Sequence, residues 1–222
     1  MNYTTKKPQR QTSSLPPVLV ILHGYGADEF DLLPIASKLD PAFLAISIQA
    51  PIELDWGGYA WYHLEQTTTG LKSDSKSRIE SEDLLIQSLP EIIKKEGGDP
   101  DQVYLMGFSQ GSAMCYSLIG RHDFEKFGLK VCGVIIMSGY IPEDVIEPLR
   151  KKDLSSIPFF LSHGIHDDLI PPIAMKVAND ILEKTGAKTF TKEYEIGHGL
   201  TEETVSDIRK WMEALRMVAA GL

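Results

Sequence analysis

The sequence has few of the features that mark secreted, nucleic-acid-binding or membrane-spanning proteins. Its 222 residues include only two cysteines, Cys115 and Cys132, which form no disulfide framework and no metal-ligand spacing; both are interpreted as small buried side chains in a reducing compartment. Basic residues number 22 against 31 acidic ones, and the net charge of −9 argues against a nucleic-acid partner or an anionic membrane surface. No apolar run approaches the ~18 residues of a spanning helix.

What is present indicates one soluble globular domain. The composition is 43% hydrophobic and 24% charged, as is typical of such proteins. Residues 1–14 are polar and contain Lys6, Lys7 and Arg10 without the apolar core of a signal peptide. We expect them to form a flexible N-terminal segment ahead of a domain at 15–222. A cytoplasmic location, with no stable membrane association, is expected by elimination.

Short apolar runs alternate with amphipathic segments along the chain. Most of the runs lack polar alternation, which is typical of strands buried on both faces of a parallel sheet. We expect strands at 15–22, 43–48, 103–108, 131–137, 157–162 and 189–195, and helices at 29–39, 79–95, 112–120, 173–184 and 201–215. This alternation predicts an α/β fold with a doubly wound, mainly parallel sheet and helices on both faces.

The most informative stretch is 103–111, where an apolar run ends in Gly-Phe-Ser-Gln-Gly and a helix-forming segment follows. This is the pattern of a nucleophile elbow, a sharp strand-to-helix turn that lifts a serine hydroxyl clear of the sheet. A serine in an ordinary glycine-flanked turn would leave the same pattern, so the motif alone does not assign a nucleophile. Its flanking elements and the residues downstream favour Ser109 in that role.

Two later strand ends carry residues that could complete a catalytic site. Asp167 and Asp168 follow the fifth expected strand, and His198 lies in a glycine-flanked loop after the last. Loops at the carboxyl ends of parallel strands gather along one edge of the sheet. A serine hydroxyl needs a base, and the base needs an acid to fix its tautomer. The chain order Ser, Asp, His is that of the α/β-hydrolases.

Two loops that follow expected strands can each be interpreted in two ways. The loop at 23–28 is either an ordinary connection or half of an oxyanion hole, with the Tyr25 N–H as donor. The aromatic, glycine-rich stretch at 55–63 either packs onto the core or walls an apolar pocket. His163 and His166 flank the acid too closely in sequence to reach the serine easily, and we interpret them as structural.

These motifs together resemble the phospholipase/carboxylesterase family, which includes acyl-protein thioesterases and small bacterial carboxylesterases. The resemblance rests on His-Gly-x-Gly-x-Asp at 23–28, Gly-Phe-Ser-Gln-Gly at 107–111, His-Gly-x-x-Asp-x-x-Ile-Pro at 163–171 and the terminal His198. It runs over about residues 18–216. It implies a single-domain α/β-hydrolase fold that needs no cofactor and no metal, and it allows a homodimer.

The resemblance also implies specific site residues. They are Ser109, Asp167 and His198 as the catalytic residues, the backbone N–H groups of Tyr25 and Gln110 as the oxyanion hole, and Trp61 and Tyr62 in the substrate pocket. The family pattern places the acid at Asp167, with Asp168 as the alternative. Tyr25 stands where the family more often has leucine, so the acyl pocket is expected to differ in shape.

The expected function is hydrolysis of carboxylic esters with short to medium acyl chains, through an acyl-enzyme on Ser109. The compact stretch at 51–66 lacks the longer apolar loop of the eukaryotic thioesterases, which argues against long acyl chains. An acyl-protein thioesterase or lysophospholipase shares the chemistry and is the first alternative, so the substrate is a small-molecule ester or acyl thioester. A catalytically inert hydrolase-fold binding protein is the alternative from another class.

Overall fold

The computed structural model describes residues 1–10, 14–67 and 70–219. Within them, seven strands form one sheet in the order β1-β3-β2-β8-β9-β10-β11. The strands are β1 (Tyr3–Lys6), β2 (Val18–Leu22), β3 (Leu44–Ile48), β8 (Val103–Phe108), β9 (Val131–Met137), β10 (Phe159–Gly164) and β11 (Thr189–Tyr194). All neighbours pair in parallel except β1 and β3. The predicted doubly wound, mainly parallel sheet is confirmed.

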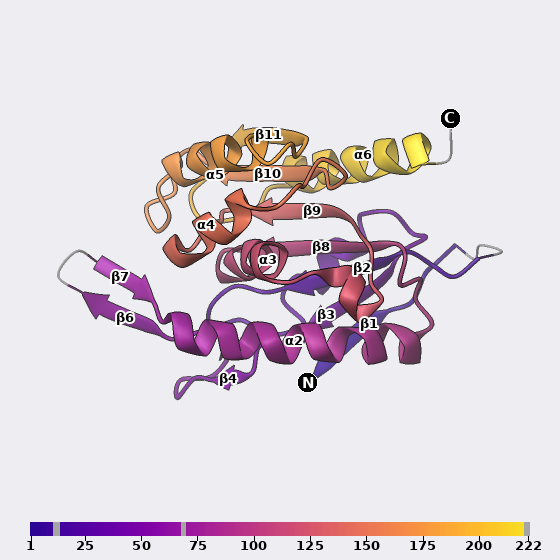
Figure 1. Cartoon of the computed structure of the whole chain (residues 1–222), viewed down its shortest axis with the longest axis horizontal. Helices are drawn as coiled ribbons and strands as arrows, with labels where there is room; N and C mark the ends of the chain where they lie inside the picture. The colour runs from indigo at the N-terminus through magenta and orange to yellow at the C-terminus, as the bar shows by residue number, and fades with distance from the viewer. Residues whose placement is uncertain (11–13, 68–69, 220–222) are drawn as a thin grey trace.

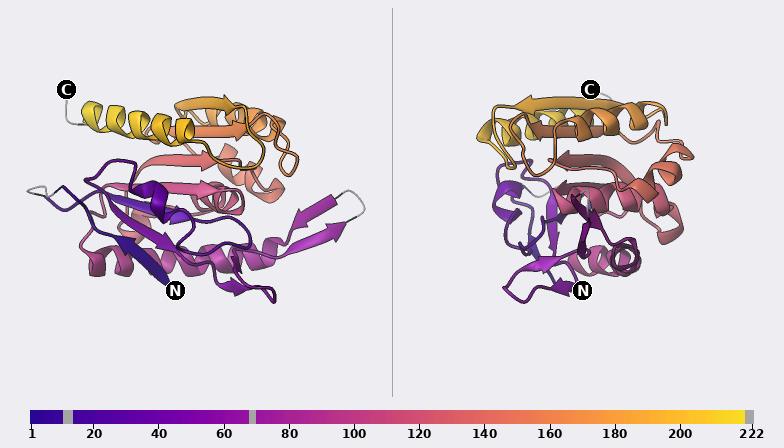
Figure 2. Two further views of the ribbon diagram at one scale, coloured as in Figure 1. Left: turned by 180° about the vertical axis from the view of Figure 1, so that it is seen from behind. Right: turned by 90° about the vertical axis from the view of Figure 1, so that its left-hand side faces the viewer.

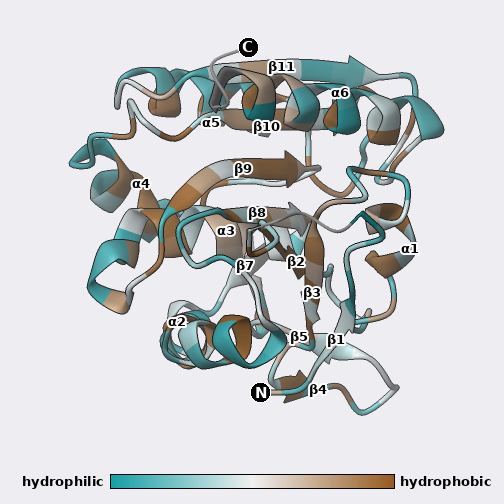
Figure 3. Ribbon diagram, turned by 90° about the vertical axis from the view of Figure 1, so that its right-hand side faces the viewer, coloured by the Kyte–Doolittle hydropathy of each residue, from teal (hydrophilic) through white to brown (hydrophobic). Residues whose placement is uncertain are grey.

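Helices cover both faces of this sheet (Figures 1 and 2). They are α1 (Leu33–Ala36), α2 (Ser75–Glu96), α3 (Gln110–Arg121), the 3-10 helix η1 (Phe124–Phe127), α4 (Glu143–Arg150), α5 (Ile173–Glu183) and α6 (Glu202–Ala219). Side chains of α2, α3, α4 and α5 pack into one core and those of α6 into a second, with the sheet between the two. The inner strands β2, β3, β8, β9 and β10 are apolar, whereas the edge strand β11 is mainly hydrophilic and the outer helix surfaces are polar (Figure 3).

Two short antiparallel ribbons lie between β3 and α2. They pair β4 (Ile52–Glu53) with β5 (Tyr59–Ala60), and β6 (Leu64–Thr67) with β7 (Gly70–Ser73). The first ribbon also joins the loop after β2, because Ala27 bridges Tyr59. The connection after β3 is therefore bound to the loop after β2 by backbone pairing at the carboxyl edge of the sheet.

The N-terminal segment differs from its prediction. β1 pairs antiparallel with β3, with Tyr3 opposite Ile48, and the Tyr3 hydroxyl donates a hydrogen bond of 3.0 Å to Glu96 Oε1. The prediction of a flexible segment at 1–14 is therefore wrong for β1, while residues 11–13 lie outside the described part. β1 covers the edge of β3, which would otherwise expose unpaired backbone groups.

Deleting residues 1–6 is therefore expected to destabilise the protein by about 2–3 kcal/mol, from a buried tyrosine face and its hydrogen bond. That corresponds to roughly 4–12 °C in Tm for a domain of this size. The measurement is thermal unfolding followed by circular dichroism. Lys7→Ala is the matched control, because it leaves β1 in place and removes an exposed ammonium group that pairs with the Glu96 carboxylate and donates to the Glu96 carbonyl oxygen. An unchanged Tm in the deletion variant would contradict the role assigned to β1.

Candidate active site

Ser109 lies at a strained turn between β8 and α3. Its backbone has φ 53° and ψ −115°, a conformation that L-residues rarely adopt. The flanking glycines have no room for a side chain. A Cβ at Gly107 would lie 2.4 Å from the Gly111 carbonyl oxygen, and one at Gly111 would lie 2.0 Å from that of Leu22. The local structure is the elbow that the glycine spacing predicts, and it holds the serine at the carboxyl edge of the sheet.

Asp167 and His198 form a hydrogen-bonded pair at the same edge. His198 Nδ1 lies 2.7 Å from Asp167 Oδ2, and Asp167 Oδ1 accepts the N–H groups of Leu169 and Ile170 at 3.0 and 2.9 Å. Burial alone would raise the pKa of Asp167, but the hydrogen bonds from Ile170 and His198 outweigh it and hold the pKa below its usual range. Asp168, the alternative acid, is exposed and does not bond to His198.

A second histidine also contacts this acid. Buried His163 has its Nε2 atom 2.8 Å from the Ile170 carbonyl oxygen and 3.2 Å from Asp167 Oδ2. Both neighbours are acceptors, so Nε2 carries the proton and donates. Sequence reasoning interpreted His163 as structural and missed this contact. Its only signal was the four-residue spacing from Asp167 across the end of β10.

His198 lies beside the elbow. Its ring packs against that of Phe108, the residue before Ser109, with centroids 4.9 Å apart. The His198 side chain is 15% exposed. Within the described part of the chain, neither Ser109 Oγ nor His198 Nε2 has a hydrogen-bond partner. Catalytic hydrogen bonds are often long without substrate and tighten in the complex.

The two predicted oxyanion donors flank the serine. Gly24, which precedes Tyr25, approaches the elbow so closely that a Cβ on it would lie 3.5 Å from Ser109 Cβ. Gln110 opens α3, where N–H groups have no acceptor within the helix. Among the described residues, no backbone or side-chain oxygen accepts the N–H of Tyr25. Two free N–H groups therefore lie beside Ser109.

The predicted pocket residues Trp61 and Tyr62 do not line an open pocket, because both are 0% exposed. Trp61 Nε1 donates to the His23 carbonyl oxygen at 2.9 Å, and the Tyr62 and Tyr140 hydroxyls lie 2.8 Å apart. The Gln110 side chain accepts the Trp61 N–H at 2.7 Å and donates to the Tyr62 carbonyl at 2.8 Å. Trp61 and Tyr62 are therefore buried and hydrogen-bonded to residues of the site, and the prediction that their side chains line the substrate pocket is wrong.

Two other aromatic side chains are exposed near the oxyanion loop. Tyr25 is 38% and Trp56 71% exposed, and their ring centroids lie 6.3 Å apart. Trp56 belongs to the same aromatic stretch at 55–63 that sequence reasoning offered as a pocket wall. The exposed apolar surface next to the Tyr25 N–H therefore comes from Tyr25 and Trp56.

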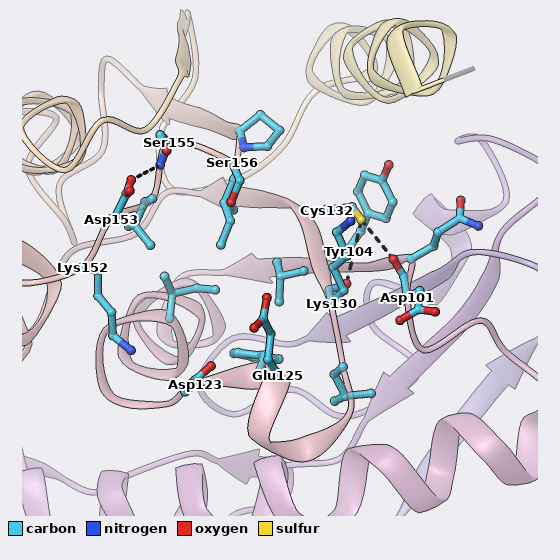
Figure 4. Close-up of a pocket in the computed structure, with 18 of the residues that line it drawn as sticks. Asp101, Tyr104, Asp123, Glu125, Lys130, Cys132, Lys152, Asp153, Ser155 and Ser156 are labelled. Atoms are coloured by element: carbon cyan, nitrogen blue, oxygen red, sulfur yellow. Dashed lines mark hydrogen bonds between the residues drawn. The ribbon is translucent and has the colours of Figure 1, made fainter. Parts of the chain in front are cut away.

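A large cavity lies elsewhere, at the amino ends of β8 to β10 (Figure 4). It has a volume of about 830 Å³ and includes Asp101, Lys130 and Cys132, but none of the predicted site residues. The Cys132 Sγ lies 3.4 Å from the Asp101 carbonyl oxygen. No group of three or more potential metal ligands occurs in the described ranges, and no helix there is long and apolar enough to cross a membrane.

Known proteins of one family resemble this chain in sequence. The model of the phospholipase/carboxylesterase family matches residues 6–216. A probable carboxylesterase, SOBER1-like, from Arabidopsis thaliana is 26% identical over 172 residues, covering 73% of this chain and 62% of the relative. Acyl-protein thioesterase 1 from Debaryomyces hansenii is 27% identical over 165 residues, covering 71% and 68%. The chain thus spans about two thirds of these relatives.

The solved structure of the Bacillus cereus carboxylesterase shares the fold. It superposes with a TM-score of 0.81 at 22% identity and covers 97% of this chain and 94% of its own. Together with the sheet order, this likeness confirms the predicted α/β-hydrolase fold. The names of the relatives and the family model support ester hydrolysis as the general activity. Since the family model matches nearly the whole length, the chain belongs to the phospholipase/carboxylesterase family.

Proposed function

We propose that this chain is a serine hydrolase that cleaves carboxylic esters of short to medium acyl chains through an acyl-enzyme on Ser109. One observation carries the proposal: the pair of His198 and Asp167, joined at 2.7 Å, packs on Phe108 next to the strained serine. A base with its acid, placed beside a serine at an elbow, is the arrangement that activates a hydroxyl as a nucleophile.

The proposed reaction proceeds in two halves. Ser109 Oγ attacks the ester carbonyl carbon while His198 Nε2 takes the hydroxyl proton, and the N–H groups of Tyr25 and Gln110 bind the oxyanion. The intermediate collapses, the carbon–oxygen bond to the alcohol breaks, and His198 returns the proton to the leaving oxygen. Water then attacks the acyl-enzyme by the same steps and releases the acid. Asp167 holds the imidazole with its proton on Nδ1 and stabilises the imidazolium.

The surroundings of the serine support a short to medium acyl chain. Tyr25 and Trp56 provide an exposed, shallow apolar surface beside the oxyanion donors. The large cavity is at the opposite edge of the sheet, where an acyl chain attached to Ser109 does not reach it. Hydrolysis of an acyl thioester is the second candidate, because relatives named acyl-protein thioesterase match the chain and Leu169, two residues after Asp167, adds exposed apolar surface.

The test is a series of p-nitrophenyl esters of increasing acyl length, together with labelling by a fluorophosphonate probe. We expect kcat/KM to peak at short or medium chains and the probe to label Ser109, as identified by peptide mass spectrometry. A steady rise towards long chains would favour the thioesterase or lysophospholipase alternative. The absence of both turnover and labelling would favour an inert binding protein. The homodimer stays a prediction, which light scattering of the purified protein measures.

A further inference from the structure

His23 is a fully buried histidine that bonds to the loop carrying Tyr25. It follows β2 directly and is 0% exposed. Its Nδ1 atom lies 2.7 Å from the carbonyl oxygen of Gly24, the next residue, and its Nε2 atom lies 3.1 Å from the N–H of Ala50, just after β3. The ring thus connects two loops at the carboxyl edge of the sheet.

These two contacts fix the protonation of the ring. A backbone N–H only donates, so Nε2 accepts the Ala50 bond through its lone pair; a carbonyl oxygen only accepts, so Nδ1 carries the proton. Both bonds exist only in the neutral ring with its proton on Nδ1. Burial lowers the pKa of His23 below its ordinary value, against the opposing effect of the Gly24 hydrogen bond, so the neutral form is favoured.

The Gly24 carbonyl and the Tyr25 N–H belong to the same peptide unit. In a trans peptide the C=O and N–H bonds point in opposite directions, so holding one fixes the direction of the other. The His23 ring holds the carbonyl on one side, and Gly24 lies against Ser109. A hydrogen bond to the carbonyl also polarises the amide, which makes its N–H a better donor.

Other contacts restrain the same loop without replacing this one. Trp61 Nε1 donates to the His23 carbonyl, one peptide earlier, and the Gly26 N–H donates to Tyr59, one residue later. The Ala27 N–H also reaches the Gly24 oxygen, at the longer distance of 3.3 Å. The bond from the ring is the shorter of the two on that carbonyl, and the turn bond would remain if the ring donor were removed.

We propose that His23 is a positioning residue for the reaction: its Nδ1–H holds the peptide between Gly24 and Tyr25 in the orientation that turns the Tyr25 N–H towards the oxyanion. The inference rests on the proposed function, because it requires a tetrahedral oxyanion at Ser109. Its effect is confined to the transition state, where the oxyanion exists, and it therefore acts on kcat rather than on KM.

The test compares two matched substitutions, His23→Asn and His23→Gln. The Asn amide nitrogen occupies the position of Nδ1 and keeps the donor to the Gly24 oxygen, whereas the Gln amide oxygen reaches the position of Nε2 and keeps the acceptor for Ala50. Each variant loses one buried hydrogen bond, so similar decreases in Tm are expected. Loss of a whole oxyanion donor costs about 10²–10³ in kcat. Because the Ala27 bond remains, we expect kcat of His23→Gln to be about 10- to 100-fold below that of His23→Asn, with equal KM.

The outcomes separate this inference from the proposed function. Ester turnover that survives in Ser109→Ala would overturn the proposed function and this inference with it. Turnover that depends on Ser109, combined with equal kcat in the two His23 variants or a difference only in KM, would overturn the inference alone. ¹⁵N NMR of the wild-type protein measures the protonation state of the His23 ring, so it does not depend on whether a variant folds. A neutral His23 protonated on Nδ1 agrees with the inference, and one protonated on Nε2 contradicts it.

Discussion

Replacing Ser109 with alanine is expected to lower kcat/KM for p-nitrophenyl esters by about 10⁴- to 10⁶-fold. The acyl-enzyme cannot form without the hydroxyl, and what remains is the acceleration due to binding and the oxyanion donors. The alanine keeps the Cβ and the strained backbone, and Ser109 Oγ has no hydrogen-bond partner among the described residues, so the fold should be unaffected. Steady-state kinetics and labelling by the fluorophosphonate probe measure the loss.

Ser109→Gly is the matched control for this variant. Both substitutions remove the nucleophile, so both should be inactive, but glycine tolerates a φ of 53° that strains alanine. Relief of backbone strain at such a site amounts to about 1 kcal/mol or more. We therefore expect Ser109→Gly to unfold at a higher temperature than Ser109→Ala. Retained turnover in either variant would contradict the assignment of the nucleophile, and an equal Tm would contradict the strain at the elbow.

The parts of the fold with a strong local signal could be predicted from the sequence. The elbow at Ser109 was predictable because only glycine fits at positions 107 and 111, where a Cβ would overlap backbone atoms of α3 or of the end of β2. The Gly-x-Ser-x-Gly spacing therefore indicates this turn directly. The buried strands were predictable from their continuous apolar runs, which the parallel sheet confirms. The strand ends and the chain order pointed to His198 and to one of the two neighbouring aspartates, whereas the choice of Asp167 over Asp168 came from the family pattern; the catalytic roles stay predictions.

Elements held by long-range contacts could not be predicted. β1 is short and polar, and it is held by pairing with β3 about forty residues later. The helix expected at 29–39 is reduced to α1, because the Asp28 carboxylate accepts the Phe30 N–H and holds the chain in a turn beyond the expected start. The residue pattern of a short segment does not show which other parts of the chain that segment will contact.

The direction of the side chains in the irregular loop at 55–63 could not be predicted from the sequence either. Trp61 and Tyr62 point inward and Trp56 outward, although all three lie in one aromatic stretch. The inward direction follows from hydrogen bonds to His23, Gln110 and Tyr140, which lie far apart in sequence. The same limit applies to His23 itself, whose two ring contacts depend on how the ends of β2 and β3 come together.

Replacing Asp167 with asparagine is expected to lower kcat by about 10⁴-fold, with little change in KM. The Asn carbonyl can keep the hydrogen bonds from the Leu169 and Ile170 N–H groups, but its NH₂ then faces His198 Nδ1. His198 must accept there through a lone pair, which moves its proton to Nε2, and the ring can no longer take a proton from Ser109. The change thus leaves the loop in place and removes the base.

Asp168→Asn makes the same chemical change at the neighbouring position and serves as the control. Asp168 is exposed and does not bond to His198, so kcat should stay within about twofold of wild type. The pair of variants distinguishes the two acids that the sequence alone leaves open. Because the protonated His163 Nε2 lies 3.2 Å from Asp167 Oδ2, the asparagine NH₂ would face this N–H donor where the carboxylate oxygen stood, and a lower Tm is expected for Asp167→Asn only. A larger loss of kcat in Asp168→Asn would transfer the role of the acid to Asp168 and contradict the geometry of the site.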